Sequence, residues 1–136
     1  MKVVINSCFG GFSVSLEALM ELIHRDAKCV AVSEWTEKDE ETVIMSGWEK
    51  IDIGDGWFTT YTKNFVVKDG LCYYVRGNDC ETRTDETLIA VVEELGDRAR
   101  GTCAHLTIVE IPDGIKWHVE EYDGNEHVTE DHGTWY

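Results

Sequence analysis

The sequence has little proline, few basic residues and no long apolar run. One proline among 136 residues, beside 43% hydrophobic residues and five tryptophans, excludes a disordered chain and predicts a folded core. Because no 18 consecutive residues are apolar, we expect no membrane-spanning helix. The apolar run in the N-terminal MKVVINSCFGG is too short for a signal peptide, so we expect a cytoplasmic protein.

Basic residues are outnumbered, with 12 Lys and Arg against 27 Asp and Glu, which gives a formal net charge of −15. Such a field repels phosphate backbones and anionic lipids, which argues against nucleic acid or a membrane as a direct partner. A partner protein with a basic surface is favoured instead. The simpler explanation, that the charge keeps a small protein soluble, stays open beside it.

Motifs of common enzymes and metal sites are missing. The five cysteines are odd in number and scattered, without a C-x-x-C pair, which indicates a reducing compartment and no zinc site. The sequence has no P-loop, G-x-G-x-x-G, G-x-S-x-G, H-E-x-x-H or EF-hand loop. We therefore expect a binding protein rather than an enzyme, and we expect neither a cofactor nor a bound metal.

What is present predicts a single α+β domain over residues 1–136, with a mostly antiparallel mixed sheet and two helices packed on it. The first helix follows a β-branched strand at residues 2–6 and is capped by Ser13 or Ser15. The second is capped by Thr84 or Asp85 and ends near Gly96. The apolar stripes are Leu16, Leu19, Met20 and Ile23 in the first helix and Leu88, Val91, Val92 and Leu95 in the second.

Turn residues divide most of the remaining chain into strands. Gly54-Asp55-Gly56 and Asp69-Gly70 each predict a hairpin between β-branched and aromatic runs. Asp123-Gly124 leads into a last strand over residues 126–129. The run at 29–32 predicts a second buried strand, which would be parallel to the N-terminal strand if the two are neighbours. The connection is also short enough to place them apart.

Two histidines are expected to lie on neighbouring strands. Residues 104–111 and 115–122 have strand patterns and are joined by Pro112-Asp113-Gly114, which favours pairing between them. His105 and His118 would then approach each other on one face, in a register that the sequence does not fix. Histidines on a sheet are more often packing residues than ligands.

The stretch from Cys8 to Ser13 contains the first candidate site. A strand that passes through glycines into a helix offers free backbone N–H groups, which bind anions, and a helix start would activate the Cys8 thiol. A tight corner that needs glycine explains the same residues without a ligand. The candidate binding residues here are Asn6, Cys8, Gly10, Gly11 and Ser13.

The second candidate site is the segment from 120 to 131, which has six acidic residues and no Lys or Arg. Carboxylates beside histidines can bind a divalent cation. Alternating acids on an exposed edge strand also discourage edge-to-edge pairing, and we predict no metal. The candidate binding residues here are Tyr122, Asp123, Glu126, Glu130 and His132.

Residues 34–41 carry five acidic residues and one lysine, and they predict an exposed loop or helical turn. This segment is the expected surface for a basic partner. The residues concerned are Glu34, Glu37, Asp39, Glu40 and Glu41. The chain is also rich in tryptophan and tyrosine, which favours a homodimer through an aromatic face or a sheet edge.

Both ends of the sequence carry distinctive motifs. The N-terminal VVINSCFGGFSVS fits the pattern V-I-N-x-C-[YF]-G-G-F-x-[LV]-S, and the C-terminal YDGNEHVTEDHGTW fits Y-D-G-x-E-x-V-x-E-x-H-R-x-W. Gly133 replaces the Arg of the second pattern, which would have balanced Glu126 or Glu130. The sequence thereby resembles a family of small phage and prophage proteins of uncharacterised function. The resemblance covers about half of the chain. It implies that the two terminal regions fold together into one surface and that the protein works in an infected or lysogenic bacterium.

The leading hypothesis is a phage-encoded acidic accessory protein that binds and modulates a host protein. A nucleic-acid-binding or defence protein would fit, because an acidic domain can occupy its basic groove. One alternative is a small-molecule or nucleotide-binding enzyme, which predicts a pocket that joins Gly10-Gly11 to the C-terminal acidic and histidine cluster. Another is a structural or virion-associated oligomer, which predicts tryptophans buried between subunits.

Overall fold

The computed structural model describes residues 1–8, 11–54, 56–59, 64–77, 80–101 and 104–130. It shows an α+β fold, which confirms the predicted class. The elements in chain order are β1 (Lys2–Asn6), α1 (Leu16–His24), β2 (Val30–Glu34), α2 (Glu37–Met45), β3 (Ile51–Gly54), β4 (Trp57–Thr59), β5 (Phe65–Lys68), β6 (Leu71–Val75), α3 (Cys80–Arg83), α4 (Glu86–Leu95), the 3-10 helix η1 (Gly96–Ala99), β7 (Leu106–Glu110), β8 (Trp117–Tyr122) and β9 (Asn125–Glu130).

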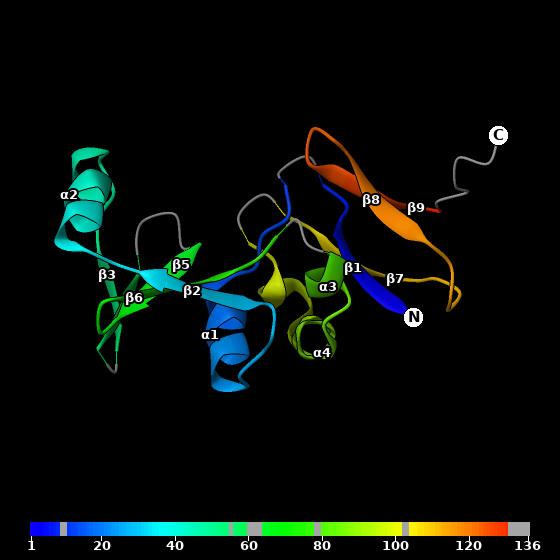
Figure 1. The fold of residues 1–136 in the computed structure, drawn as a ribbon, viewed down its shortest axis with the longest axis horizontal. Helices are drawn as coiled ribbons and strands as arrows, with labels where there is room; N and C mark the ends of the chain where they lie inside the picture. The colour runs from blue at the N-terminus through cyan, green and yellow to red at the C-terminus, as the bar shows by residue number, and fades with distance from the viewer. Residues whose placement is uncertain (9–10, 55, 60–63, 78–79, 102–103, 131–136) are drawn as a thin grey trace.

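The strands of the described residues belong to three antiparallel sheets. The largest has the order β2-β6-β5-β4-β3, while β1 pairs with β7 and β8 pairs with β9. Figure 1 shows the large sheet and α2 toward one end of the molecule, the β8–β9 hairpin toward the other, and α1 and α4 between them. No described helix has the length and apolar composition that crossing a membrane requires.

The core lies where α1, α4 and β1 meet. Leu19 and Leu22 of α1, Leu88 and Val91 of α4, and Val4 of β1 are almost completely buried in one cluster. Burial of each side chain of this size stabilises the fold by roughly 1.5–3 kcal/mol. The core therefore depends on the two helices that the apolar stripes predict.

Both of these helices begin at a side-chain cap. The Ser15 hydroxyl accepts a hydrogen bond from the Ala18 N–H, and the Asp85 carboxylate accepts bonds from the N–H groups of Thr87 and Leu88. At the other end of α4, Gly96 has a φ of 57°, a backbone conformation that glycine adopts without strain. Ser15, Asp85 and Gly96 confirm the predicted helix limits.

The two-residue turns also follow the prediction. Asp69 and Gly70 have φ values of 52° and 75°, and Asp123 and Gly124 have values of 50° and 88°. A type I′ turn requires positive φ at both central residues, which Asp-Gly tolerates. The turns fix the registers of β5–β6, with Lys68 opposite Leu71, and of β8–β9, with Tyr122 opposite Asn125.

Three predictions of strand and helix placement need correction. The expected pairing of residues 104–111 with 115–122 is wrong, because β7 pairs along its whole length with β1 and β8 pairs with β9. His105 and His118 are therefore not on neighbouring strands. The run at 29–32 forms β2, which pairs antiparallel with β6 and so lies apart from β1, one of the two placements that the sequence leaves open. The expectation that this strand is buried is wrong, because Cys29 is buried but every residue of β2 is half-buried or exposed.

The acidic segment differs too, since α2 is a nine-residue helix rather than a loop or single turn. It begins with a capping box, in which Thr36 and Asp39 each accept a hydrogen bond from the other's backbone N–H.

Candidate functional site

Strand β1 and the β8–β9 hairpin meet at Asn6, whose side chain is completely buried. Its backbone N–H donates to Oε1 of Glu126 at 2.8 Å, and its amide Nδ2 donates to the carbonyls of Gly124 at 2.6 Å and Cys8 at 2.7 Å. Its Oδ1 accepts from the His105 N–H at 2.8 Å. The amide of Asn6 thus fastens β1 to the β8–β9 turn.

A buried ion pair adjoins this junction. Nη1 and Nη2 of Arg83 lie 2.6 and 2.8 Å from Oε1 and Oε2 of Glu126, and the two side chains are 3% and 5% exposed. Nε of Arg83 donates to the Gly77 carbonyl at 2.8 Å. Both carboxylate oxygens of Glu126 are thereby engaged. Glu126 therefore has a structural role, and its carboxylate oxygens are not available to a ligand.

Arg83, from the short helix α3, supplies the positive charge beside Glu126. Sequence reasoning missed Arg83 because the two residues are 43 positions apart and their pairing depends on the packing of α3 beside β1 and β9. The buried, hydrogen-bonded cluster of Asn6, Arg83 and Glu126 is called the junction below.

The described residues of the glycine stretch do not surround a helix N-terminus. Cys8 is half-buried and precedes the first helical residue, Leu16, by eight positions. Gly11 has a φ of 83°, and Gly10 lies outside the described residues. A Cβ on Gly101 would lie 2.1 Å from Oγ of Ser13, so Ser13 is packed closely against that glycine. The N-terminus of α1 belongs to Ser15.

The other C-terminal candidates that the structure describes are not members of the junction. Tyr122 is 72% exposed at the end of β8, Asp123 forms the turn, and Glu130 is exposed at the end of β9. His132 lies outside the described residues. Among the predicted binding residues that the structure describes, hydrogen bonds of Asn6 connect Asn6 with Cys8 and Glu126.

One cluster on β8 and β9 was not predicted as a group. Nε2 of His118 lies 3.0 Å from Oε1 of Glu120, and Nε2 of His127 lies 3.2 Å from Oε2 of the same carboxylate. These hydrogen bonds, that from His118 most of all, lower the pKa of Glu120. Within the described part of the chain, no group of three His, Cys, Asp or Glu residues is arranged to hold a metal ion.

The acidic candidates gather around α2. Glu34 ends β2, Glu37 and Glu41 are exposed on the helix, and Asp39 is occupied by the capping box. Glu40 forms an ion pair with Lys50. None of these five carboxylates is buried, so the segment is the exposed acidic surface that the sequence predicts.

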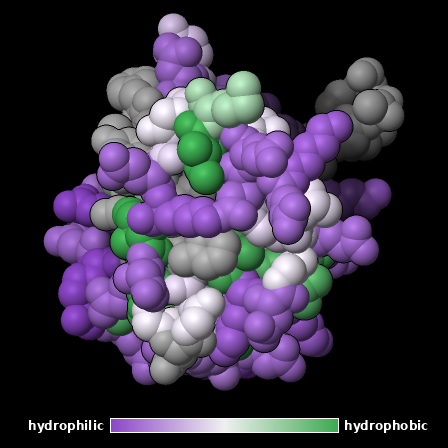
Figure 2. All heavy atoms as spheres, turned by 90° about the vertical axis from the view of Figure 1, so that its left-hand side faces the viewer, coloured by the Kyte–Doolittle hydropathy of each residue, from purple (hydrophilic) through white to green (hydrophobic). Residues whose placement is uncertain are grey.

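Two apolar side chains stand at the C-terminal end of α2. Ile44 is 52% exposed and Met45 is 87% exposed, and no residue of this helix is buried. Figure 2, which looks onto this end of the molecule, shows hydrophobic side chains at the surface among hydrophilic ones. The surface formed by Glu37, Glu41, Ile44 and Met45 is called the α2 surface below.

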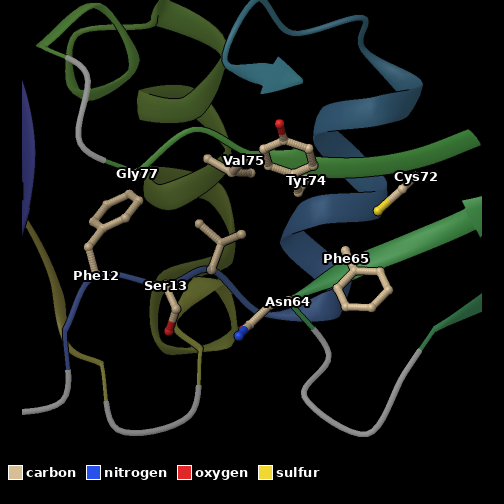
Figure 3. Close-up of a pocket in the computed structure, with 9 residues that line it drawn as sticks. Phe12, Ser13, Asn64, Phe65, Cys72, Tyr74, Val75 and Gly77 are labelled. Atoms are coloured by element: carbon tan, nitrogen blue, oxygen red, sulfur yellow. The ribbon is translucent and has the colours of Figure 1, made fainter. Parts of the chain in front are cut away.

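A cavity of about 390 Å³ lies between the stretch before α1 and the β5–β6 hairpin (Figure 3). It is lined by Phe12, Ser13, Val14, Asn64, Phe65, Cys72, Tyr74, Val75 and Gly77. None of the C-terminal candidates within the described residues lines it. The pocket expected of an enzyme, from the glycines to the C-terminal cluster, therefore does not coincide with this cavity.

Comparison of the chain with family models, with curated proteins and with solved structures finds no match.

Proposed function

We propose that this chain is an acidic accessory protein that binds a basic protein of a bacterial host through the α2 surface. The resemblance to phage proteins supports a host protein as the partner. The observation that carries the proposal is that no residue of α2 is buried and that Ile44 and Met45 are 52% and 87% exposed.

Helices at the surface of a globular protein usually bury one apolar face. Residues of α1 and α4 do so, whereas α2 has no buried residue and leaves Met45 87% exposed. Exposing apolar side chains on a helix in water is unfavourable unless another molecule covers them, and helices commonly bind partners through such side chains. Ile44 and Met45 are therefore the expected anchors.

The charge around these anchors selects the partner. Residues 34–52 include seven acidic residues and two lysines, and one of the lysines, Lys50, is paired with Glu40. A basic surface complements this field and accelerates association, and high salt weakens the attraction. The same field opposes contact between two copies of α2, which favours a different protein over a second copy of this chain.

The proposal is tested with the full chain as bait in host lysate, at low and high salt. A double variant, Ile44→Ser with Met45→Ser, removes the anchors, and Glu37→Lys with Glu41→Lys reverses the charge. Matched controls are Tyr122→Ser, an exposed apolar residue elsewhere, and Glu110→Lys with Glu121→Lys, an equal change in net charge away from α2. We expect a basic protein that is retained by the wild type and by both controls, and is lost with both α2 variants and at high salt.

Two results would overturn the proposal. Capture that is equally strong with the α2 variants would show that another surface binds. Self-association in analytical ultracentrifugation that disappears with Ile44→Ser and Met45→Ser would show that a second copy of the chain covers α2.

A further inference from the structure

We propose that the cavity between residues 12–14 and the β5–β6 hairpin binds a small, uncharged, planar aromatic molecule with one polar edge. The cavity is separate from the proposed protein-binding surface, because no residue of α2 lines it. Its volume of about 390 Å³ lies within the range of known small-molecule sites, roughly 300–1,000 Å³.

The planar aromatic character of the ligand follows from the walls. Figure 3 shows the rings of Phe12 and Phe65 on opposite sides of the cavity, with the Tyr74 ring on a third side. Aromatic rings attract one another in offset-stacked or edge-to-face arrangements beyond the contribution of their buried area. A flat ring between Phe12 and Phe65 would contact aromatic surface on several sides.

The ligand is expected to be uncharged because the lining that the structure describes is uncharged. Although 29% of the residues of this chain are charged, none of the nine described lining residues is acidic or basic. Burial also raises the pKa of the Cys72 thiol, which keeps it protonated at neutral pH. An ion in this cavity would lose hydration without gaining a countercharge from the lining.

The polar edge is assigned from the remaining side of the cavity. Ser13 and Asn64 lie together there, and the other walls are mostly hydrocarbon and aromatic. A hydroxyl and an amide can each donate and accept a hydrogen bond. One polar edge on the ligand would face these two groups while its ring faces Phe12, Phe65 and Tyr74.

The aromatic walls are held in place before any ligand arrives. The Arg83 guanidinium lies 3.7 Å from the centroid of the Phe12 ring. The same guanidinium donates a hydrogen bond to the Glu126 carboxylate, which holds it in position. On the opposite wall, the Trp35 and Phe65 rings pack with centroids 5.3 Å apart. Such preorganisation reduces the entropy that a ligand loses on binding. The junction thus acts as the support of one wall of the cavity.

Indole is a suitable probe because it is neutral, flat and carries one N–H edge. We expect it to bind the full chain with a dissociation constant below about 1 mM. In ¹H–¹⁵N NMR spectra it should shift the Asn64 side-chain amide and the backbone amides of Val75 and Gly77. It should also raise the melting temperature through mass action. Benzoate, which is of similar size but charged, should do neither.

Gly77→Leu is the most informative variant. Among the described residues, a Cβ at this position would have only Phe12 Cδ1 within 4 Å, at an ordinary contact distance of 3.7 Å, and the Gly77 backbone needs no positive φ. Leucine should therefore fill the cavity without unfolding the chain, and weaken indole binding by about tenfold or more. Tyr74→Leu should weaken it as well, whereas Tyr122→Leu, the same change on an exposed ring outside the cavity, should not.

Several outcomes would overturn this inference while leaving the proposed function intact. They are an indole response that Gly77→Leu and Tyr74→Leu leave unchanged, spectral shifts confined to other regions, or equal binding of benzoate. Conversely, Gly77→Leu should retain the protein partner of the α2 surface, so that failure of one proposal is distinguishable from failure of the other.

Discussion

Arg83 and Glu126 show how strongly one pair of residues can connect distant parts of a chain. Their side chains are 3% and 5% exposed, and Glu126 also accepts the backbone N–H of Asn6. Taking two charges out of water is costly, and their attraction offsets that cost only while both partners remain. The junction is therefore more sensitive to the loss of one charge than to most single substitutions at the surface.

Glu126→Gln should lower the free energy of unfolding by about 3–5 kcal/mol, because it leaves the Arg83 charge buried without its partner. Urea denaturation of the variant and the wild type measures this loss. Glu130→Gln is the matched control on the same strand, where the carboxylate is exposed, and its effect should stay within about 0.5 kcal/mol. Equal effects of the two substitutions would show that burial of the pair does not govern stability.

Glu120 gives a pH-dependent prediction at the same scale. Hydrogen bonds, first from His118 and then from His127 and Thr129, lower its pKa below the ordinary value of 4.5. A carboxyl whose pKa falls on folding contributes stability above its unfolded pKa, and this contribution disappears as the pH drops through the folded value. Carboxyl-carbon NMR titration should place the midpoint below 4.5 in the wild type.

In the variant His118→Ala, the midpoint of Glu120 should move up toward the ordinary value, since the largest cause of the shift is gone. His24→Ala removes a histidine from α1 instead and should leave the Glu120 titration in place. An unchanged midpoint after the loss of His118 would contradict the assigned cause.

At the scale of elements, α2 and α4 both begin with a side-chain cap, but they differ in how they pack against the rest of the fold. Thr36 and Asp39 cap α2, and Asp85 caps α4. Helix α4 buries Leu88 and Val91 in the core, whereas no residue of α2 is buried. The stability of α4 is therefore linked to that of the whole fold, while α2 depends on its local hydrogen bonds.

Thr36→Ala should destabilise α2 by about 1 kcal/mol through loss of the cap. Because α2 is locally supported, amide hydrogen exchange should accelerate by about fivefold within the helix, and the urea midpoint of the whole protein should stay unchanged. The matched change Asp85→Ala should instead lower the global midpoint. A fall of the global midpoint with Thr36→Ala would show that α2 is part of the cooperative core.

At the scale of the whole molecule, sequence reasoning succeeded where signals are local. Ser15, Asp85 and the Asp69-Gly70 turn act within a few residues of themselves, so their sequence neighbours suffice to predict them. The pairing of β1 with β7 joins residues more than 95 positions apart, for example Asn6 with Leu106, and no local pattern specifies it. Local signals favoured β8 as the partner of β7, and the long-range pairing prevailed.

The candidate sites divide in the same way. The acidic run predicted the exposed carboxylates around α2, because charge alone places them in water. The acidic run did not indicate that Ile44 and Met45 are also exposed, because their exposure depends on how α2 packs in the tertiary structure. The cavity was likewise invisible, because Phe12 and Tyr74 are brought together only by the tertiary fold.

The buried Asn6 amide has a consequence for the synthesis of the protein. Its N–H and amide partners at Glu126 and Gly124 follow it by 120 and 118 residues. At a translation rate of about 5–20 residues per second, roughly 6–24 s pass between the synthesis of Asn6 and that of Glu126. Until then the core cannot close around Asn6 without leaving polar groups unsatisfied, so the fold is completed only after Glu126 has been synthesised.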